Sequence, residues 1–519
     1  MYITQPLHRA LQQHPDRTAL ICGSRRTSFR QLADRVARLA GGLRGLGMRD
    51  GDRVAILALN SDRYFEYLIG VPWGGGIINP CNTRWSVAEL AYALNDSGSR
   101  ILLVDDMFQA LAPELKALCE DLDLVIHIGD VPTPDGMVGY EELIARSDPM
   151  ADALRRDEDL LGLFYTGGTT GAPKGVMLSH ANFMSSALAL AAEGIVTPGG
   201  VFLHAAPIFH LADLGCSSVA WILGNAHSFI PGFSPPSVVE AIERDRVTDT
   251  LLVPTMVQML VDHPVMAQGR DISSIRTILY GGSAISEAVL DRALAALPNV
   301  SFWQAYGMTE LAPVATILAA AYHRPEGRRG DRLRSGGRAA YCTEIRVADP
   351  ADNPLPAGVK GEVLVRGPNV MKGYWNKPEQ TAAALRGGWM HTGDVGYLDG
   401  DGFLFIIDRM KDMIISGGEN IYSAEVENAL ARHAAVQTCA IIGIPSDKWG
   451  EAVHGFVILK PGQAATQDEL IAHCRQWIAG YKCPRSIEIV NTLPLSGPGK
   501  ILKTELRKRF WSDRDQQVS

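Results

Sequence analysis

The residues from Phe164 to His180 are of types that could hold a polyphosphate. Between Thr166 and Lys174 the chain carries three threonines, three glycines and the lysine itself. Glycines let the backbone turn sharply and present N–H groups to an anion, and the hydroxyls and the ammonium group add further donors. A mobile surface loop is the plainer interpretation of such a run. The Walker phosphate loop does not fit, because Lys174 lies between Pro173 and Gly175 and not before Ser or Thr.

Two further stretches could contact a nucleotide. In the stretch Gln304-Ala-Tyr-Gly-Met-Thr-Glu310, Tyr306 could stack on a base and Thr309 could donate to a phosphate. Glu310 could hold Mg²⁺, which takes hard oxygen ligands and shares them with phosphates. Taken alone, a strand end followed by a helix start explains this stretch better. The stretch Tyr280-Gly-Gly-Ser283 could support a flat ring on bare backbone, although a tight turn explains it better in isolation.

Three candidate stretches follow nearer the C-terminus. Asp394, after a glycine, could accept two hydroxyl protons from a ribose, or it could be a solvated turn residue. The charged run Asp408-Arg409-Met410-Lys411 could contact a nucleotide or form ion pairs at a linker. Lys500 lies on a Gly/Pro loop, where a lone surface lysine is the commoner explanation. The functional alternative is a mobile loop that delivers the positive charge of Lys500 to a reacting phosphate.

The composition limits the class of protein. A chain of 519 residues is too long for one core and predicts two to four domains. The net charge of −8, from 49 basic and 57 acidic residues, disfavours a nucleic-acid surface. Eight scattered cysteines without a C-x-x-C pair favour reduced, packed thiols in a cytoplasmic protein. The first 23 residues lack the apolar core of a signal peptide, and no apolar run is long enough for a membrane span. A peripheral membrane contact stays open.

The hydrophobic pattern predicts alternating helices and strands. Ser28 with Gln31 and Ser86 with Glu89 form capping boxes that begin two helices. Short apolar runs begin at positions 53, 101, 124, 250, 276 and 300, and a helical pattern covers 287–297. This alternation predicts an α/β fold with a largely parallel sheet. From position 341 to 407 short alternating runs predict a small antiparallel β unit, and the last hundred or so residues alternate again.

The six stretches, in this order and at this spacing, resemble the adenylate-forming superfamily of acyl-CoA synthetases, non-ribosomal adenylation domains and luciferases. The resemblance extends from about residue 7 to 510. It implies a large N-terminal domain of stacked α/β sheets with a small β unit over 1–407, which would hold ATP and the acid. It also implies a hinge at 408–411 and a small mobile α+β C-terminal domain over 412–519.

The resemblance implies a role for each matching residue. Tyr306, Gly281, Gly282 and Ser283 match the adenine site, and Asp394 and Arg409 match the pair that holds the ribose. Thr166, Thr169, Thr170 and Lys174 match the loop over the β- and γ-phosphates, and Thr309 and Glu310 match the catalytic turn, with Glu310 as the Mg²⁺ ligand. Gly167 stands where the family usually has serine, and Ser283 where alanine is more usual.

The implied reaction has two halves. A carboxylate attacks the α-phosphorus of Mg·ATP and expels pyrophosphate, while Lys500 stabilises the charge that accumulates. The small domain then rotates about Lys411, and Gly417 and Gly418 line the path along which coenzyme A reaches the acyl-adenylate. Trp449, with Tyr481 and Lys482, is a candidate for contacting the nucleotide of coenzyme A, and an ordinary surface role is equally compatible.

The acyl pocket implied by the resemblance includes the stretch Pro207–Gly215, with His210 and Leu214, and also Tyr280, Ala305 and Val314. No Arg or Lys lies between Ile208 and Gly224, so a second carboxylate would lack a partner and a dicarboxylate is disfavoured. Leu214 falls near the position where long-chain members carry a gating Trp, which weakens the case for a very long chain. His210 either faces the substrate or packs.

These points predict an ATP-dependent acyl-CoA ligase for a monocarboxylic acid, either a medium- or long-chain fatty acid or an aryl-propenoic acid such as a ferulate-like one. The expected partners are that acid, ATP with Mg²⁺, and coenzyme A, and a homodimer is one option for the assembly. A stand-alone acyl-adenylating enzyme that loads a carrier protein is the alternative. No feature supports a luciferase. A non-catalytic nucleotide sensor would not need Lys500 beside Glu310, Asp394 and Arg409.

Overall fold

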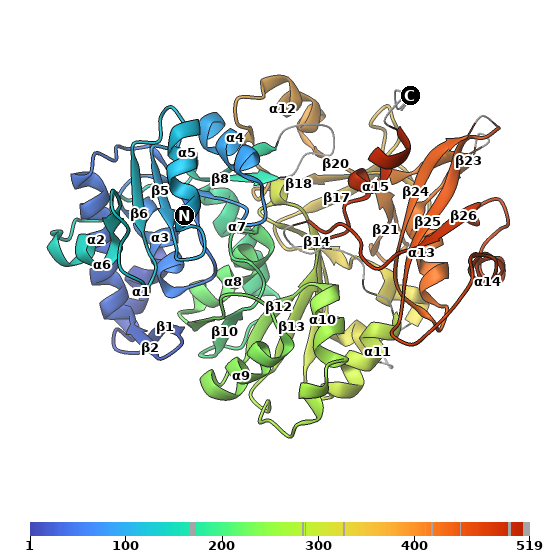
Figure 1. Cartoon of the computed structure of the whole chain (residues 1–519), viewed down its shortest axis with the longest axis horizontal. Helices are drawn as coiled ribbons and strands as arrows, with labels where there is room; N and C mark the ends of the chain where they lie inside the picture. The colour runs from blue at the N-terminus through green and yellow to red at the C-terminus, as the bar shows by residue number, and fades with distance from the viewer. Residues whose placement is uncertain are drawn as a thin grey trace. The chain divides into compact units, whose positions relative to one another are not determined.

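The computed structural model describes residues 1–511, except 167–172, 283, 284, 286, 325, 326, 328, 410, 411, 417, 418, 447 and 497–499. Figure 1 labels the helices and strands along the chain. The chain divides into two compact units. Unit 1 contains Met1–Ala284, Val289–Ile345 and Val365–Met390, and unit 2 contains Ile285–Ala288, Arg346–Leu364 and His391–Ser519. The predicted α/β class, with one large and one small part, is confirmed. The predicted hinge at 408–411 and the domain limits around it stay predictions.

Unit 1 holds a first sheet of nine described strands in the order β16-β15-β14-β13-β12-β10-β11-β1-β2. The pairs from β1 through β11, β10, β12 and β13 to β14 are parallel, and β2, β15 and β16 join antiparallel at the two edges. The bounds are β1 Thr18–Cys22, β2 Arg25–Ser28, β10 Val201–His204, β11 Ala226–Phe229, β12 Asp249–Leu252, β13 Thr277–Gly281, β14 Ser301–Gly307, β15 Val314–Leu318 and β16 Arg338–Ala339. The largely parallel sheet is therefore as the sequence predicts.

A second sheet of unit 1 has eight described strands in the order β19-β9-β8-β4-β3-β5-β6-β7. Its β9 and β19 are antiparallel to their neighbours, and the pairs among the other strands are parallel. The bounds are β3 Arg53–Leu57, β4 Ile77–Pro80, β5 Ile101–Val104, β6 Leu124–His127, β7 Val138–Gly139, β8 Leu160–Thr166, β9 Lys174–Ser179 and β19 Gly373–Tyr374.

Helices lie between and around these sheets. Helix α7 (His180–Ala192) packs on β8 and β9, helix α8 (Leu211–Leu223) packs on β10, β11 and β12, and the two helices pack on each other. The two sheets are thus stacked with these helices in between. The predicted capping boxes begin α2 and α4. The other helices in this part are α1 Gln5–Gln13, α2 Phe29–Gly45, α3 Asp62–Trp73, α4 Val87–Ser97, α5 Ala112–Leu118, α6 Tyr140–Arg146, α9 Pro235–Asp245, α10 Pro254–Val261, α11 Glu287–Ala296 and α12 Pro378–Ala384.

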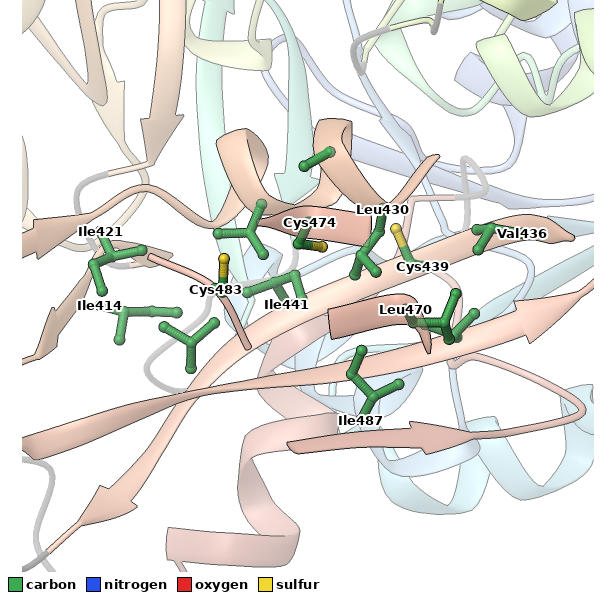
Figure 2. Close-up of a cluster of buried hydrophobic side chains, with 14 residues drawn as sticks. Ile414, Ile421, Leu430, Val436, Cys439, Ile441, Leu470, Cys474, Cys483 and Ile487 are labelled. Atoms are coloured by element: carbon green, nitrogen blue, oxygen red, sulfur yellow. The ribbon is translucent and has the colours of Figure 1, made fainter. Parts of the chain in front are cut away.

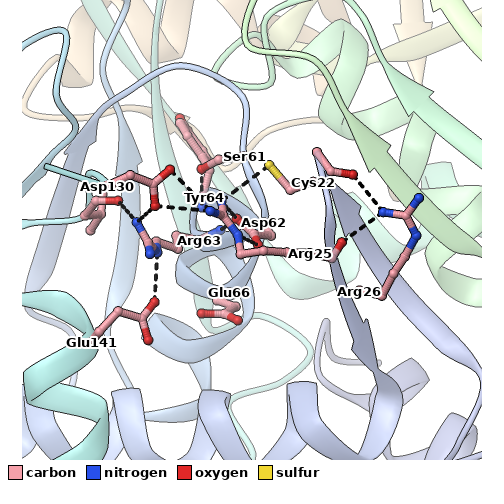
Figure 3. A network of polar contacts seen from close by, with 12 residues as sticks. Cys22, Arg25, Arg26, Ser61, Asp62, Arg63, Tyr64, Glu66, Asp130 and Glu141 are labelled. Carbon is pink, nitrogen blue, oxygen red and sulfur yellow. Dashed lines mark hydrogen bonds and ion pairs between the residues drawn. The ribbon is translucent and has the colours of Figure 1, made fainter. Parts of the chain in front are cut away.

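A charged network ties the edge strand β2 to helices of the second sheet (Figure 3). Arg25 makes a bidentate pair with Asp62, with nitrogen–oxygen distances of 2.8 and 2.9 Å. Both Arg25 and Arg63 also reach Asp130, and Arg63 Nε lies 2.8 Å from Glu141 Oε1. Bidentate arginine pairs add geometric specificity to charge, so this network links β2 of the first sheet to helix α3 beside the second.

Unit 2 holds most of a third sheet of four described strands in the order β17-β18-β20-β21, whose first strand begins in unit 1. These strands are β17 Glu344–Ala348, β18 Gly361–Arg366, β20 Met390–Leu398 and β21 Leu404–Arg409. A fourth sheet has the strand order β23-β22-β25-β24, and β26 pairs with β25. Its elements are β22 Ile414–Ser416, β23 Glu419–Ile421, β24 Val436–Ser446, β25 Gly450–Leu459, β26 Ser486–Ile489, α13 Ser423–Ala431, α14 Gln467–Cys474 and α15 Lys503–Trp511.

The fourth sheet is covered on both faces. Ile441 of β24 packs with Leu430 of α13 and Leu470 of α14 on one face (Figure 2). The neighbouring Ile442 packs with Leu506 of α15 on the other face. Because successive strand residues point to opposite faces, an apolar run such as Ala440-Ile441-Ile442 fits a sheet that is buried on both sides.

The cysteines and the helix lengths of this structure bear on two predictions from the sequence. All eight cysteines lie in its described part and are free thiols there, and six of them are buried. Among the described helices, none combines the length and the apolar character that crossing a membrane requires.

Candidate active site

The hairpin of β8 and β9 carries the predicted phosphate loop. Thr166 ends β8 and pairs with Lys174, which begins β9. The short strand β19 pairs with β9 on its other side, with Tyr374 opposite Val176. This pairing brings Tyr374, two hundred residues along the chain, beside Lys174. The ammonium group of Lys174 lies 4.9 Å from the centre of the Tyr374 ring, which is within cation–π range.

Tyr374 also contacts the predicted metal ligand. Its hydroxyl donates a 2.9 Å hydrogen bond to Oε1 of Glu310, and Glu310 is only 6% exposed. Burial raises the pKa of Tyr374 well above its ordinary value, and the negative charge of Glu310 adds to the shift. The phenol therefore stays protonated and donates. Consecutive side-chain contacts within unit 1 therefore link Lys174 to Tyr374 and Tyr374 to Glu310.

The turn that carries Glu310 is held by the segment from Asn369 to Met371, which contains no predicted site residue. Thr309 and Glu310 begin a short 3-10 turn, Thr309–Leu311. The buried side chain of Asn369 donates to the carbonyl oxygens of Leu311 and Val314, both at 2.9 Å, and Met371 N donates to the Glu310 carbonyl at 2.8 Å. The signal in the sequence next to this segment is Gly373, because a glycine in a strand often marks a close approach of another part of the chain.

The predicted adenine wall lies at the ends of β13 and β14. Gly281 pairs with Ala305, and a Cβ at Gly281 would lie 2.4 Å from the Ala305 carbonyl oxygen. The wall is therefore bare backbone, as the glycine predicts, and Gly282 follows with a positive φ of 81°. Tyr306 belongs to β14 and pairs with Thr316 of β15.

Tyr280, predicted to line the acyl pocket, is fully buried. Its hydroxyl lies 2.9 Å from Nε2 of His323 and 3.1 Å from Oε1 of Gln304. These contacts link β13 to Gln304 of β14 and to His323, and the place of Tyr280 in the acyl pocket stays a prediction. In the same pair of strands Gly281 lies opposite Ala305, and Tyr280 lies opposite Gln304.

Helix α8 carries the other predicted pocket residues. His210 is its N-cap, and Nδ1 of His210 accepts a 3.2 Å hydrogen bond from Ala212 N. Leu214 is 4% exposed and lines a small apolar cavity together with Phe65 and Trp221. The next residue, Gly215, lies so close to Pro313 that a Cβ there would be 2.2 Å from Pro313 Cδ. Because Val314 follows Pro313, this contact puts α8 against the start of β15.

A buried group of ionisable residues lies at the start of α8. His204 Nδ1 is 2.5 Å from Oδ2 of Asp213, and His204 Nε2 is 2.9 Å from Nδ1 of His227. Burial raises the pKa of Asp213 and lowers the pKa of His227 well below its ordinary value. The carboxylate in this stretch is thus already engaged by His204, which leaves apolar residues to form most of the predicted acyl pocket.

Unit 2 carries the predicted ribose pair. Asp394 lies in β20 opposite Arg409 of β21, and Nε of Arg409 is 3.1 Å from Oδ1 of Asp394. Asp394 is 4% exposed, which rules out the solvated-turn interpretation. Gly393 before it has a positive φ of 69°.

Lys500 lies next to a short antiparallel bridge in unit 2. Leu495 and Ile501 form an antiparallel bridge, and Lys500 N donates to Ser496 Oγ at 3.0 Å. Ser496 N donates back to the Lys500 carbonyl at 2.6 Å. These contacts fix the backbone of Lys500 locally.

Trp449 is 38% exposed. The ammonium group of Lys448 and the guanidinium group of Arg485 lie 4.8 and 5.7 Å from its ring centres. This exposed aromatic surface with two cations is compatible with a nucleotide contact. Six predicted residues lie outside the described part of the chain: Thr169, Thr170, Ser283, Lys411, Gly417 and Gly418.

The described residues fit a magnesium ion that is held mainly by phosphates. Among them there is no cluster of three or more His, Cys, Asp or Glu side chains that could cage a metal. Glu310 offers a single buried carboxylate whose position Tyr374 fixes. Mg²⁺ is typically bound through one or two carboxylates together with substrate phosphates, so this arrangement suits it.

Comparison with known families assigns the chain to a class. The model of the AMP-binding enzyme family matches residues 7–375, and the model of the AMP-binding enzyme C-terminal domain matches residues 425–500. The chain belongs to this family, which is the adenylate-forming superfamily predicted from the sequence. It is an acyl- or aryl-CoA ligase relative of the AMP-forming acid–thiol ligase type.

Particular relatives cover the chain almost completely. A feruloyl-CoA synthase from Amycolatopsis sp is 41% identical over 510 residues, which are 97% of this chain and 98% of that protein. The fatty acid–[acyl-carrier-protein] ligase ScoC from Streptomyces coeruleorubidus is 35% identical over 512 residues, 98% of this chain and 96% of that protein.

Two solved structures are similar over the full length. ATP-bound MatB from Rhodopseudomonas palustris has a TM-score of 0.88 and 29% identity, covering 99% of both chains. The anthranilate CoA ligase AuaEII in complex with anthranoyl-AMP has a TM-score of 0.89 and 27% identity, covering 98% of this chain and 97% of that one. These likenesses agree with the α/β fold and the AMP-forming class.

Proposed function

We propose that the chain is an ATP-dependent ligase that forms the coenzyme A thioester of an aryl-propenoic acid of the ferulate type. The similarity to feruloyl-CoA synthase carries this proposal, because identity is 41% over 510 residues against 35% for the fatty-acid ligase ScoC. The pocket chemistry supports it. No Arg or Lys lies between Ile208 and Gly224, and the acidic Asp213 is buried against His204, so the stretch suits an acid with one carboxylate.

In the proposed first half-reaction, an oxygen of the acid attacks the α-phosphorus of ATP. The bond between that phosphorus and the bridging oxygen breaks, and pyrophosphate leaves with the electron pair. Lys174 and the backbone of its loop bind the β- and γ-phosphates, and Tyr306 and Gly281 bind adenine. Asp394 and Arg409 hold the ribose, and the Lys500 ammonium group offsets the charge that develops at phosphorus.

Glu310 would hold Mg²⁺, which supplies charge neutralisation at the phosphates when bound. Tyr374 keeps the Glu310 carboxylate in one orientation through its 2.9 Å hydrogen bond. The role of Tyr374 is therefore positioning, which its raised pKa permits by keeping the phenol protonated.

In the proposed second half-reaction, the sulfur of coenzyme A attacks the acyl carbon of the adenylate. The thiol proton goes to solvent, the acyl–oxygen bond breaks, and AMP leaves. Rotation of the C-terminal domain about the hinge at 408–411 separates the two halves, withdrawing Lys500 and presenting Gly417 and Gly418. The exposed ring of Trp449, with Lys448 and Arg485 beside it, is the proposed contact for the nucleotide part of coenzyme A.

A carrier-protein ligase for a fatty acid is the alternative, and the similarity to ScoC favours it over other rivals. The two functions differ in the acceptor. Pyrophosphate release should be measured with ferulate, a medium-chain fatty acid and acetate, each with and without coenzyme A. The proposal expects ferulate-dependent release and feruloyl-CoA in the presence of coenzyme A. Adenylate that accumulates and reacts only with a carrier protein would favour the alternative.

The cytoplasmic location of the protein stays a prediction.

A further inference from the structure

We propose that Asp408, Ser423, Lys503 and Glu427 form a hinge latch, with Lys503 as a positioning residue that sets the balance between the two half-reactions. This inference rests on the proposed function, because it assigns a purpose to a buried polar cluster beside the expected hinge. The cluster takes no part in the chemistry described above. Its members come from β21, α13 and α15, all within unit 2.

Asp408 is the first element of the hinge latch. It is 7% exposed, and its Oδ2 accepts hydrogen bonds from the backbone N–H of Ser423 and, at 2.7 Å, from the Ser423 hydroxyl. Its Oδ1 accepts from Arg409 N at 2.8 Å. Because Arg409 is half of the ribose pair, Asp408 connects the nucleotide-binding strand directly to the first residue of α13.

Lys503 is the second element. Its ammonium group donates to the Ser423 hydroxyl at 2.6 Å and lies 2.8 Å from Oε1 of Glu427. Burial opposes the charged form, yet the pKa of Lys503 is raised because Glu427, Asp408 and Asp412 surround it with negative charge. Glu427 Oε1 in turn accepts from Ile441 N at 2.8 Å, which anchors the cluster in strand β24.

The latch also reaches the catalytic loop through the backbone. Lys503 begins α15 only three positions after Lys500, and Leu502 N donates to the Pro494 carbonyl at 2.8 Å. The side chain that donates to the Ser423 hydroxyl therefore belongs to the first residue of the helix that follows Lys500. The shared Ser423 hydroxyl, which donates to Asp408, thus relates the strand of Arg409 to the segment that carries Lys500.

The arrangement matters because the latch residues lie on opposite sides of the hinge in the sequence. Asp408 comes before Lys411, and Ser423, Glu427 and Lys503 come after it. The contacts between Asp408 and Ser423 join segments on either side of the proposed hinge, and we expect a rotation about Lys411 to break them. The latch therefore favours the arrangement in which they are made. Breaking a buried pair by removing one partner is costly, so its loss should shift the distribution between the two arrangements.

A matched pair of variants on one helix tests the proposal. Lys503→Met removes a latch partner, whereas Arg507→Met removes the 2.7 Å pair between Arg507 and Asp412, both of which follow Lys411. We expect Lys503→Met to change the ratio of the adenylation rate to the thioester-forming rate by about tenfold, a shift of about 1.4 kcal/mol between the two arrangements. Arg507→Met should lower both rates by the same factor. Equal losses in both half-reactions of Lys503→Met would overturn the proposal.

A second variant and a distance measurement also test the latch. Ser423→Ala removes the hydroxyl that joins Asp408 to Lys503 while keeping the backbone donor. It should shift the ratio of the adenylation rate to the thioester-forming rate in the same direction, even if Lys503→Met folds poorly.

Spin labels at Asp401→Cys and Asp468→Cys, with Cys22 and Cys342 replaced by serine, report the distance between the two sides of the hinge without catalysis. The latch predicts a changed distance distribution in Lys503→Met and an unchanged one in Arg507→Met. An unchanged distribution in both would contradict the latch, and absence of pyrophosphate release with any acid would instead contradict the proposed function.

Discussion

The hydroxyl of Tyr374 lies 2.9 Å from Oε1 of Glu310, although 64 residues separate them in the sequence. This contact exists because β19 pairs with β9 and so returns the chain to the strand that begins at Lys174. The predicted phosphate loop and the predicted metal ligand are therefore connected through a residue that belongs to neither stretch.

Tyr374→Phe should weaken magnesium use without disrupting the fold. The ring stays in place beside Lys174, but Glu310 loses a hydrogen bond donated to a charged group, which typically contributes about 1.5–3 kcal/mol. We expect about tenfold slower adenylation at low Mg²⁺ and partial recovery at high Mg²⁺, measured as pyrophosphate release over a magnesium titration.

Tyr165→Phe is the control for this variant. It removes a hydroxyl of β8 that donates at 2.6 Å to Asp96 of helix α4. Its magnesium dependence should match the wild type. The positioning role of Tyr374 would be wrong if both variants shifted the magnesium titration equally.

Lys500→Ala should separate the two half-reactions. Loss of the ammonium group should slow adenylation by about 10²–10³-fold, as is typical when one donor that stabilises transition-state charge is removed. Thioester formation from a preformed acyl-adenylate should stay largely intact, as rapid-quench measurements can test.

Gly418→Leu should slow thioester formation and leave adenylation largely intact, because a side chain would obstruct the path of coenzyme A. Equal losses in both half-reactions would count against a domain rotation.

Gly281→Ala should impair nucleotide binding more than acid binding. The added Cβ would lie 2.4 Å from the Ala305 carbonyl, so β13 and β14 would have to move apart at the adenine wall. Overpacking of this kind costs about 1–3 kcal/mol, and we expect a rise of about tenfold in KM for ATP.

Gly232→Ala serves as its control, because a Cβ there meets nothing within 4 Å. Steady-state kinetics with each substrate varied in turn would separate the two Michaelis constants. An equal rise of KM for ATP and for the acid in Gly281→Ala would argue against the adenine assignment.

Glu141→Gln should reduce stability at neutral pH more than at acid pH. Burial would raise the pKa of Glu141, but hydrogen bonds and charges from Arg35 and Arg63 lower it below its ordinary value of 4.5. A lowered pKa in the folded state contributes stability above pH 4.5, and this contribution is lost as the pH falls through the folded value. Because Glu141 is half-exposed, we expect about 1 kcal/mol or less at pH 7.

Thermal unfolding from pH 7 to pH 3 measures this difference. Glu142→Gln is the matched control, since Glu142 is more exposed and its distance to Arg146 is 3.9 Å. A destabilisation by Glu141→Gln that stayed constant over the whole pH range would contradict the lowered pKa.

Local patterns predicted much of the fold. Ser28 and Ser86 begin helices at the predicted positions because a capping box satisfies backbone donors within four residues. The run from Thr277 to Gly281 is a strand because short buried apolar segments between turns favour parallel sheets. Such signals depend on neighbours in sequence, so one sequence is enough to find them.

Long-range pairings could not be predicted in the same way. Asn369 contacts Leu311 and Tyr374 contacts Glu310, and the pairing of β19 with β9 places Tyr374 there. Asp394 likewise looked compatible with an exposed turn until its pairing with Arg409 placed it in a sheet. The latch residue Lys503 carried no signal at all, because a lysine at a helix start is ordinarily exposed.

The most direct test of the central claim is the formation of feruloyl-CoA from ferulate, Mg·ATP and coenzyme A by the purified chain. Mass spectrometry of the products should find feruloyl-CoA, AMP and pyrophosphate in equal amounts, with feruloyl-AMP and pyrophosphate alone when coenzyme A is omitted. ADP and phosphate in place of AMP and pyrophosphate, or no ferulate-dependent product at all, would contradict the account.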